Sequence, residues 1–435
     1  MMTDLLSLSP PSFCDFLAAE GIQRFFLVWD DAAERVRVSH PQLQSLADFF
    51  AADTRDFDQH EGFFVQRAPE TGVLQGACVH RTCRGQAAGG VRYWSYDSVE
   101  DYLRDGLRLG LGMTLKNALA GLWWGGGKGV MAKGTGAADA ETRQRRLVYE
   151  EYGAFMTSLR GCYVTAEDVG TAVPDMAAIF SRTRFTTCIP PELGGSGNPS
   201  VPTALGVVRG MEAALAHLEM GSLEGRTVAM QGLGHVGEPL ISFLAERGVA
   251  RVVGTDIDPA RIETLRSAHP GMELELRVVA RGDNSVLATK ADIVAPCATG
   301  GVLNPKTIPL IQAPIVCGAA NNQLEDPTRD DLLLEKAGVL YMPDFLVNRM
   351  GIVACADEQF GSVDDDPAIQ RHLGDHWDNS IYRLSLSLLE RSRATKRPLA
   401  RVALELAAER SRELHPIWGH RGAQIVRSLA AGGWA

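Results

Sequence analysis

Two lysines in unusual surroundings are the first candidates for chemistry in this sequence. Arginine supplies most of the positive charge, since only seven of the 43 cationic side chains are lysines. Lys116 lies in an apolar, helix-like pattern, and Lys128 follows two tryptophans and three glycines. Burial and a neighbouring cation would each lower the pKa of such a lysine towards the range of a general base. The alternative is that both are surface lysines whose stems cover apolar groups.

A pair of adjacent carboxylates is the next candidate. Glu167 and Asp168 follow a short β-like run that begins at Tyr163. Adjacent acids often cap a helix or face solvent in a loop. The residue types alone therefore leave a structural interpretation as good as a functional one.

Residues 231–237, Gln-Gly-Leu-Gly-His-Val-Gly, match the Gly-x-Gly-x-x-Gly pattern of a dinucleotide-binding turn. An apolar strand precedes the turn, a helical pattern follows, and the next strand ends in Asp256, 19 residues after Gly237. Gly232 would permit the tight turn, Gly234 the approach to the pyrophosphate and Gly237 the close packing of helix on strand. Asp256 would bind the ribose hydroxyls and repel a 2′-phosphate, which favours NAD over NADP. The alternative is a structural turn without a cofactor.

The elements that position these residues follow from the sequence pattern. Leucines recur every fourth residue from 103 to 115, which predicts a long helix that carries Lys116 and ends at the glycines 125–127. Short β-rich runs separated by Gly-containing turns occupy 62–94. A segment rich in Pro and Gly between 185 and 200 is typical of a connection between domains.

After residue 200, apolar runs of strand length alternate with helical segments, which indicates an α/β domain with a parallel sheet. Beyond Asp344 the pattern is helical, most clearly at 381–393 and 399–414. Residues 1–60 suggest a small separate unit with a hairpin at 25–38. The expected strands of the parallel sheet are 227–231, 251–256, 291–295, 315–318 and 339–342. We therefore expect an N-terminal extension at 1–60, a substrate-binding domain at 61–198, a Rossmann dinucleotide-binding domain at 199–345, and C-terminal helices at 346–435 that pack back on the first domain.

Composition excludes several classes of protein. The chain has 435 residues, is 45% hydrophobic and carries a net charge of −10, as expected of a globular protein with more than one domain. The acidic balance without a basic run argues against binding to nucleic acid or to a membrane surface. Eight cysteines without Cys-x-x-Cys spacing, in a sequence without an export signal or an apolar span, predict buried thiols and a cytoplasmic location.

Several motifs, taken in order, resemble those of the Glu/Leu/Phe/Val dehydrogenase family. The resemblance covers roughly residues 62 to 412 and is closest to the leucine dehydrogenase branch. It implies a two-domain α/β enzyme that forms homo-oligomers through its first domain. The implied reaction is the reversible, NAD-dependent oxidative deamination of an L-amino acid to a 2-oxo acid and ammonia. The matching motifs are residues 89–92, 112–117, 125–128, 165–170, 202–206, 295–298, 320–323 and 343–345.

The same resemblance assigns roles by position, and we expect no metal ligand among the site residues. Lys128 would be the base that activates the hydrolytic water, and Asp168 would exchange a proton with the substrate nitrogen. Lys116 would bind the substrate carboxylate with help from Asn348. The remaining substrate-binding positions are Ala88, Gly89, Ala166, Ile352 and Cys355. The NAD-binding positions are Gly232, Gly234, His235, Val236, Gly237, Asp256 and Ala298, with Thr203 and Asn321 at the nicotinamide end.

The substrate class can be argued from one position. Glutamate dehydrogenases carry a lysine just before the Gly-Gly pair, where this chain has Ala87 and Ala88. Burying a carboxylate without that partner costs several kcal/mol, so we expect an apolar substrate such as leucine, valine or isoleucine. The leucine branch usually has a larger aliphatic residue than Ala88, so phenylalanine or tryptophan is the alternative.

Three departures from the family pattern leave another class of function open. Residues 348–351 read Asn-Arg-Met-Gly where the family has Asn-Ala-Gly-Gly, which places bulk near the expected site. The pair Trp123 and Trp124 is larger than usual, and residues 1–60 have no family counterpart. An NAD-binding regulatory protein without turnover is therefore the alternative to an enzyme.

Overall fold

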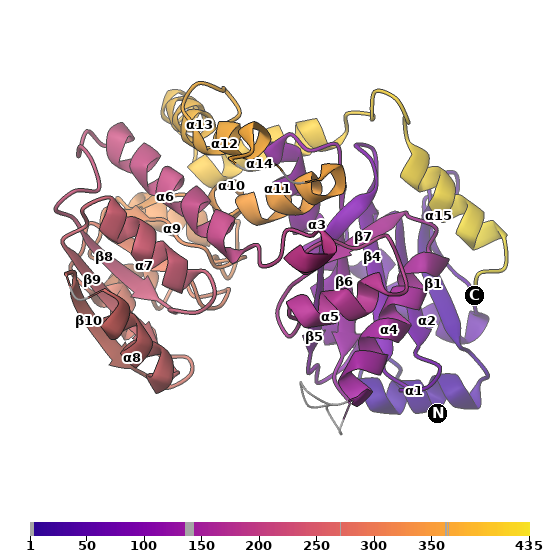
Figure 1. Cartoon of the computed structure of the whole chain (residues 1–435). Coiled ribbons are helices and arrows are strands. Elements are labelled where there is room, and N and C mark those ends of the chain that lie inside the picture. Colours follow the sequence, from indigo (N-terminus) through magenta and orange to yellow (C-terminus); the bar gives the residue numbers. More distant parts are fainter. Residues whose placement is uncertain (1–3, 135–142, 270, 362, 364) are drawn as a thin grey trace. The chain divides into compact units, whose positions relative to one another are not determined.

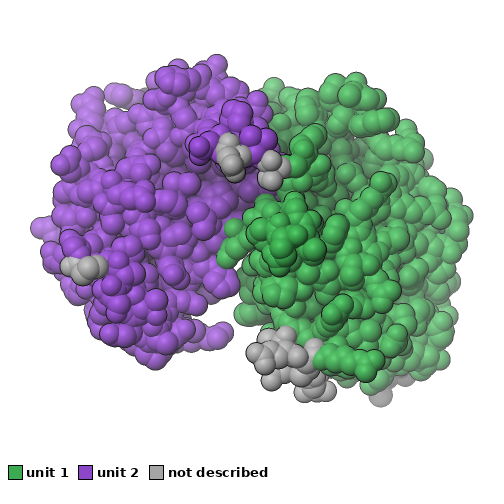
Figure 2. Space-filling view, viewed as in Figure 1, with its two compact units in different colours: residues 1–198, 358–362, 407–435 green, residues 199–357, 363–406 purple. Residues whose placement is uncertain are grey.

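The computed structural model describes residues 4–134, 143–269, 271–361, 363 and 365–435. The chain divides into two compact units, drawn in different colours in Figure 2. The first unit consists of residues 1–198, 358–362 and 407–435, and the second of 199–357 and 363–406.

The first unit is built on a mixed sheet, several strands of which are labelled in Figure 1. The strand order is β2-β1-β3-β4-β6-β5-β7. Strand β5 pairs in parallel with β6 and β7, and the other neighbours are antiparallel. The β-rich pattern of residues 62–94 is thus confirmed. The strands are β1 Arg24–Asp30, β2 Arg35–Val38, β3 Gly62–Arg67, β4 Leu74–Arg81, β5 Ala87–Trp94, β6 Gly125–Ala132 and β7 Tyr163–Ala166.

The hairpin expected near the N-terminus is confirmed, but it does not form a separate unit. Strands β1 and β2 pair as predicted, and β1 also pairs with β3. Phe25 and Leu27 are buried in the same core cluster as Phe63 and Leu103. The first 60 residues therefore belong to the first unit, because their apolar residues complete its core and β1 covers the edge of β3.

The helices of the first unit include the one that carries Lys116. Helix α3 begins after Ser98, whose side chain accepts a hydrogen bond from the Asp101 backbone N–H. It ends at Gly121 in a left-handed conformation, before the triple glycine at which its end was predicted. The glycines instead open strand β6, so the prediction placed the helix end too late. The helices are α1 Pro10–Ala19, α2 Gln44–Ala52, α3 Val99–Ala120, α4 Arg143–Ser158, α5 Val173–Phe180 and α15 Arg421–Ala431.

The second unit contains a parallel sheet in the order β10-β9-β8-β11-β12-β13. Counted along the chain this is 3-2-1-4-5-6, the order of a doubly wound dinucleotide-binding domain. All five predicted strands are present. Strand β10 at the edge of the sheet was not predicted. In its sequence, exposed charged residues alternate with apolar ones. The strands are β8 Thr227–Gln231, β9 Arg251–Asp256, β10 Glu273–Val278, β11 Ile293–Pro296, β12 Ile315–Val316 and β13 Leu340–Tyr341.

The C-terminal helices are shared between the units. Residues 363–406 belong to the second unit, where α13 packs on α6, and this differs from the predicted return to the first domain. The contact is close because Gly206 on α6 leaves room for Ile381 on α13. Residues 407–435 belong to the first unit. The helices with residues in the second unit are α6 Ser200–His217, α7 Gly237–Glu246, α8 Pro259–Ala268, α9 Asp330–Lys336, α10 Asp344–Val347, α11 Met350–Asp357, α12 Pro367–Leu373, α13 Ile381–Thr395 and α14 Leu399–Ser411.

The structure can be compared with the expectations for the cysteines and for membrane-spanning segments. All eight cysteines are free of disulfides, and six of them are buried. Across the described residues, none of the helices has both the length and the apolar character needed to cross a membrane.

Candidate active site

Lys128 and Asp168 meet in the interior of the first unit. Lys128 lies on β6 and is 4% exposed, and Asp168 follows the end of β7. The Lys128 Nζ is 2.7 Å from the Asp168 Oδ2. Strand β5 lies between β6 and β7, and a side chain at Gly90 would come within 2.7 Å of the Asp168 Cβ. The absence of a side chain at this glycine leaves the space that Asp168 occupies beside β5.

Arg92 is the member of this cluster that the sequence argument did not single out. Its Nε lies 3.2 Å from the Asp168 Oδ2, and its Nη1 lies 3.0 Å from an oxygen of Asp105 on α3. The Tyr96 hydroxyl donates to the other Asp105 oxygen over 2.8 Å. Arg92 lies two residues after Gly90, so its side chain lies on the face of β5 at which Gly90 leaves space for Asp168. That alternation is the signal that could have identified it.

Burial and neighbouring charges set the protonation of this cluster. Burial lowers the pKa of Lys128 below its ordinary value of 10.5, and the nearby Arg92 lowers it further although Asp168 opposes the shift. Burial would raise the pKa of Asp168, but the charges of Lys128 and Arg92 outweigh it and hold that pKa well below the usual range. Burial, followed by the charges of Asp168 and Asp175, raises the pKa of Glu167 to about 7. Asp168 is therefore an ionised acceptor beside a lysine that can lose its proton.

The structural alternatives were a surface lysine, and acids that cap a helix or face solvent. They do not describe Lys128 and Asp168. Lys128 is buried, so it is not a surface lysine with a solvated head. Asp168 pairs with Lys128 and Arg92, whereas the carboxylate that caps α5 belongs to Asp175. One cation beside Lys128 is Arg92, whose charge lowers the pKa of the lysine after burial.

The other predicted residues of the first unit lie on the strands around this pair. Ala88 and Ala166 are buried on β5 and β7, and Gly89 pairs with Thr165 across the same two strands. Lys116 is half-buried near the end of α3. The next residue, Asn117, donates its amide to the backbone oxygens of Ala88 and Gly125, over 3.3 and 2.5 Å. This amide fixes the end of the lysine-bearing helix to β5 and β6.

The predicted cofactor turn joins β8 to α7 in the second unit. Gly232 has a φ of +88°, and a Cβ there would lie 2.7 Å from the Cβ of Ala298. A Cβ at Gly237 would clash with the carbonyl oxygen of Gly232, so the helix starts close against the turn. The turn is accessible just before α7, where His235 is exposed and Gly234 and Val236 are half-buried. This arrangement fits a pyrophosphate approached by backbone N–H groups at a helix start.

Asp256 ends β9 beside this turn, as predicted. Its Oδ2 accepts a hydrogen bond from the Leu233 N–H over 2.7 Å. Arg261 on α8, which the sequence argument missed, places Nη1 3.7 Å from the same oxygen. Asp258, two residues later, caps α8 by accepting from the Ala260 N–H over 2.9 Å.

Asn348 and Asn321 also meet in the second unit. The Asn348 amide nitrogen donates to the Asn321 Oδ1 over 2.8 Å and to the Ala319 carbonyl over 3.0 Å. Thr203 donates to the Pro199 carbonyl over 2.8 Å, and a Cβ at Gly351 would lie 2.7 Å from its hydroxyl. Ile352 and Cys355 are both buried and, three residues apart on α11, lie on one face of it.

The departure from the family pattern at positions 349 and 350 is accommodated by the core. Arg349 and Met350 are both 0% exposed. Arg349 donates to the Asn379 carbonyl, and its charge contributes, after burial, to lowering the pKa of His372 to about 3. Met350 packs where Gly206 of α6 leaves space. Both side chains thus support the layer formed by α6, α12 and α13. Packing therefore explains the bulk at these two positions, which had suggested a protein without turnover.

The double variant Arg349→Ala, Met350→Gly is therefore expected to destabilise the second unit without raising activity. Removing two buried side chains and adding a helical glycine should cost about 3–6 kcal/mol. Thermal unfolding followed by circular dichroism measures the loss. Ala354→Gly on the same helix is the control, with an expected cost of about 1 kcal/mol. Higher turnover in the double variant would contradict this interpretation.

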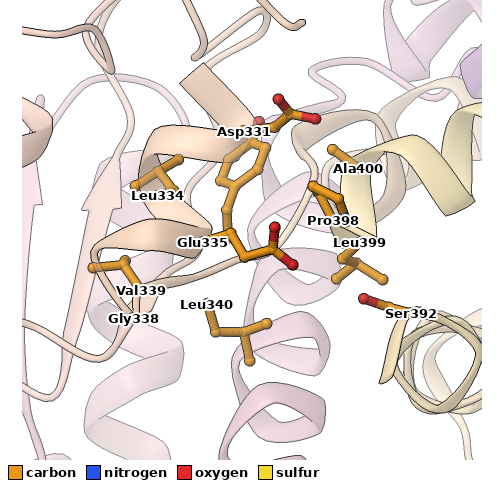
Figure 3. A pocket seen from close by; sticks show the side chains of 11 residues that line it. Asp331, Leu334, Glu335, Gly338, Val339, Leu340, Ser392, Pro398, Leu399 and Ala400 are labelled. Atoms are coloured by element: carbon orange, nitrogen blue, oxygen red, sulfur yellow. The ribbon is translucent and has the colours of Figure 1, made fainter. Parts of the chain in front are cut away.

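A pocket elsewhere in the second unit lies between α9, β13 and the start of α14 (Figure 3). Its lining includes Leu334, Glu335 and Leu399. Asp331, another lining residue, accepts a hydrogen bond from Arg401 over 2.6 Å, which ties α9 to α14. None of the predicted site residues lines this pocket, so it does not bear on the chemistry above.

Comparison with known proteins decides the family. Residues 64–185 match the dimerisation domain of the Glu/Leu/Phe/Val dehydrogenases, and residues 194–363 match the Glutamate/Leucine/Phenylalanine/Valine dehydrogenase domain. The chain belongs to the Glu/Leu/Phe/Val dehydrogenase family. The members of this family are NAD(P)-dependent oxidoreductases, so the expected recognition, fold and enzyme class are confirmed.

Named relatives of this dehydrogenase include enzymes for different amino acids. It is 41% identical over 306 residues to leucine dehydrogenase of Geobacillus stearothermophilus, an alignment that covers 70% of this chain and 79% of that enzyme. It is 38% identical over 358 residues to valine dehydrogenase of Streptomyces coelicolor, covering 82% and 93%. Among solved structures, L-tryptophan dehydrogenase from Nostoc punctiforme is similar with a TM-score of 0.63 and 32% identity, covering 81% of this chain and 96% of that one.

Proposed function

We propose that this dehydrogenase catalyses the reversible, NAD-dependent oxidative deamination of an apolar L-amino acid to a 2-oxo acid, ammonia and NADH. The observation that carries the proposal is the buried contact of 2.7 Å between Lys128 and Asp168. A lysine of lowered pKa beside an ionised carboxylate is suited to moving protons between water, substrate nitrogen and protein.

The chain's own residues have separate tasks in this proposal. Lys128 in its neutral form takes a proton from the attacking water, and Asp168 exchanges a proton with the substrate nitrogen. Lys116 binds the substrate carboxylate as a compact cation, and Asn348 helps to orient it. Arg92 is a positioning residue, because it holds Asp168 on one side and Asp105 of α3 on the other.

The dinucleotide would be held by the turn at Gly232, Gly234 and Gly237, with Asp256 at the adenosine ribose. When bound, NAD accepts the hydride that leaves the substrate α-carbon. Thr203, Ala298 and Asn321 would contact its nicotinamide part. Assembly as a homo-oligomer through the first unit is part of the same proposal.

We predict that Asp256→Ser shifts the ratio of kcat/KM for NAD over NADP towards NADP by about tenfold or more. The change removes the carboxylate that repels a 2′-phosphate and leaves Arg261, now without its partner 3.7 Å away, to bind that phosphate. Steady-state kinetics with both cofactors measures the ratio. Asp258→Ser is the matched control, because serine keeps the N-cap of α8 and the ratio should change little. An unchanged ratio in Asp256→Ser would show that Asp256 does not select the cofactor.

The substrate class is tested by a panel of amino acids assayed by NADH absorbance. We expect leucine, valine or isoleucine to give the highest kcat/KM and glutamate to give at least about 100-fold less, because Ala87 and Ala88 offer its carboxylate no cation. Activity confined to glutamate would overturn the proposal.

An aromatic substrate is the second candidate, favoured by one observation. Ala88 is buried and small at the position where the leucine branch usually has a larger aliphatic residue. The chain also resembles an L-tryptophan dehydrogenase structure at 32% identity. A kcat/KM for phenylalanine or tryptophan above that for leucine would select this alternative.

A further inference from the structure

A second cluster of reactive side chains lies in the first unit and shares no residue with those assigned above. Glu61 precedes β3, Cys83 follows β4, and His420 precedes α15. One ligand atom from each lies within 4.8 Å of the other two. The His420 Nε2 is 2.9 Å from the Glu61 Oε1 and 3.7 Å from the Cys83 Sγ. Three segments far apart in the sequence thus bring an oxygen, a sulfur and a nitrogen together.

This donor set has the chemistry that zinc prefers. Zn²⁺ binds cysteine sulfur, histidine nitrogen and carboxylate oxygen in tetrahedral geometry, whereas Mg²⁺ and Ca²⁺ take oxygen ligands. In a tetrahedral zinc site the nitrogen and oxygen ligands lie about 3.4 Å apart and the nitrogen and sulfur ligands about 3.6 Å apart. The observed nitrogen–sulfur separation of 3.7 Å is close to this value, and the nitrogen–oxygen separation of 2.9 Å would have to widen by about 0.5 Å, so an ion could enter with small side-chain movements.

The surrounding structure orients the three groups. The Thr82 N–H donates to the Glu61 Oε1 over 2.7 Å, and the Thr82 hydroxyl donates to the other oxygen. The His415 N–H donates to the Cys83 carbonyl over 2.9 Å and so holds the segment that leads to His420. Gly422 lies so close to Thr82 that a Cβ there would clash with it. Such outer contacts are what fix ligands in protein metal sites.

Hydrogen bonds hold the same groups together when no ion is bound. The His420 Nε2 contacts both the Glu61 carboxylate and the Cys83 sulfur, so a bound ion would replace these contacts with metal bonds. His420 is 34% exposed, which leaves solvent access for a fourth ligand. Glu61 and His420 both lie outside the ranges that match the two family domains, 64–185 and 194–363.

We propose that Glu61, Cys83 and His420 form a Zn²⁺ site, completed by water, that fastens the C-terminal segment to the sheet of the first unit. The site joins the ends of β3 and β4 to the start of α15 and takes no part in the proposed deamination. It therefore stands independently of the substrate and cofactor assignments.

The test is a titration of the reduced, tag-free, full-length protein with Co²⁺, followed by displacement with Zn²⁺. We expect one equivalent of Co²⁺ per chain and a thiolate-to-cobalt charge-transfer band in the near ultraviolet that Zn²⁺ abolishes. Zinc should also raise the thermal midpoint and slow proteolysis in the segment before α15. Failure of the wild-type protein to bind either ion stoichiometrically would overturn the proposal, whatever the behaviour of variants.

Variants identify the ligands. Cys83→Ser should remove the charge-transfer band, and His420→Ala should weaken Zn²⁺ binding by more than about tenfold. His376→Ala, at a fully exposed histidine, and Cys297→Ser are the matched controls and should retain the band and the affinity. Circular dichroism establishes that each variant is folded. A band that persists in folded Cys83→Ser would place the ion elsewhere and overturn the assignment.

Discussion

Replacing Lys128 by alanine should lower the kcat/KM for deamination by about 100- to 10,000-fold, the usual contribution of a general acid–base group. The protein is expected to stay folded, because Asp168 keeps Arg92 as a partner 3.2 Å away. Lys128→Arg should be nearly as inactive, since a guanidinium does not give up its proton near neutral pH. Steady-state kinetics combined with circular dichroism separates loss of activity from loss of structure.

The pH dependence gives a second measurement of the same role. Lys128 acts as a base only when neutral, so kcat/KM should rise with pH through the pKa of Lys128. Burial places that pKa below the ordinary value of 10.5, so the rise should come at lower pH than an exposed lysine would give. Asp168 stays ionised throughout, because Lys128 and Arg92 hold its pKa well below the usual range. A profile without this rise would argue against Lys128 as the base.

Lys133 provides the matched control for Lys128. It follows the same strand and lies over the ring of Tyr93, 5.5 Å from its centroid, so its removal also deletes a cation near β6. Lys133→Ala should keep the wild-type kcat/KM and pH profile. A loss in Lys133→Ala equal to that in Lys128→Ala would show that the effect is electrostatic and not specific to the proposed base.

The sequence identified the residues whose type is chemically unusual and missed those whose role depends on folding. Lys128 stood out because the chain uses few lysines, and the structure places it 2.7 Å from Asp168. Arg92 did not stand out, because an arginine in an arginine-rich chain is ordinary until Asp168 and Asp105 are brought beside it. Arg261 was missed for the same reason, since its contact with Asp256 forms only when α8 packs beside β9.

The fold shows the same division between local and long-range information. Apolar runs predicted the buried strands of the second unit, whereas the edge strand β10, in which apolar and charged residues alternate, has no continuous apolar run. Strand β6 was missed because glycine has low β propensity and the triple glycine was interpreted as a helix end. The folded structure shows why side chains are absent there: a Cβ at Gly126 would clash with Thr114 on α3, and a Cβ at Gly125 or Gly127 would clash with a backbone oxygen of β4.

Gly126→Ala is expected to cause a large loss of stability in the first unit. A Cβ at this position would clash with the backbone nitrogen and hydroxyl of Thr114 on α3. Backbone atoms in a packed helix cannot move aside like the end of a flexible side chain, so the cost should be about 3 kcal/mol or more. Lys128 lies two residues later on the same face of β6, so a displaced α3 should also lower kcat in the fraction that remains folded.

Gly112→Ala on α3 is the matched control, because it adds the same methyl group to a glycine that has nothing within 4 Å. Alanine is the better helix former, so this variant should gain up to about 1 kcal/mol. Thermal unfolding and kcat measured on both variants distinguish close packing from a general intolerance of substitution. Equal stability of Gly126→Ala and wild type would mean that the triple glycine serves the backbone conformation and not the approach of α3. In that case the position of Lys128 would have to depend on its pairing with Asp168 and not on the helix above it.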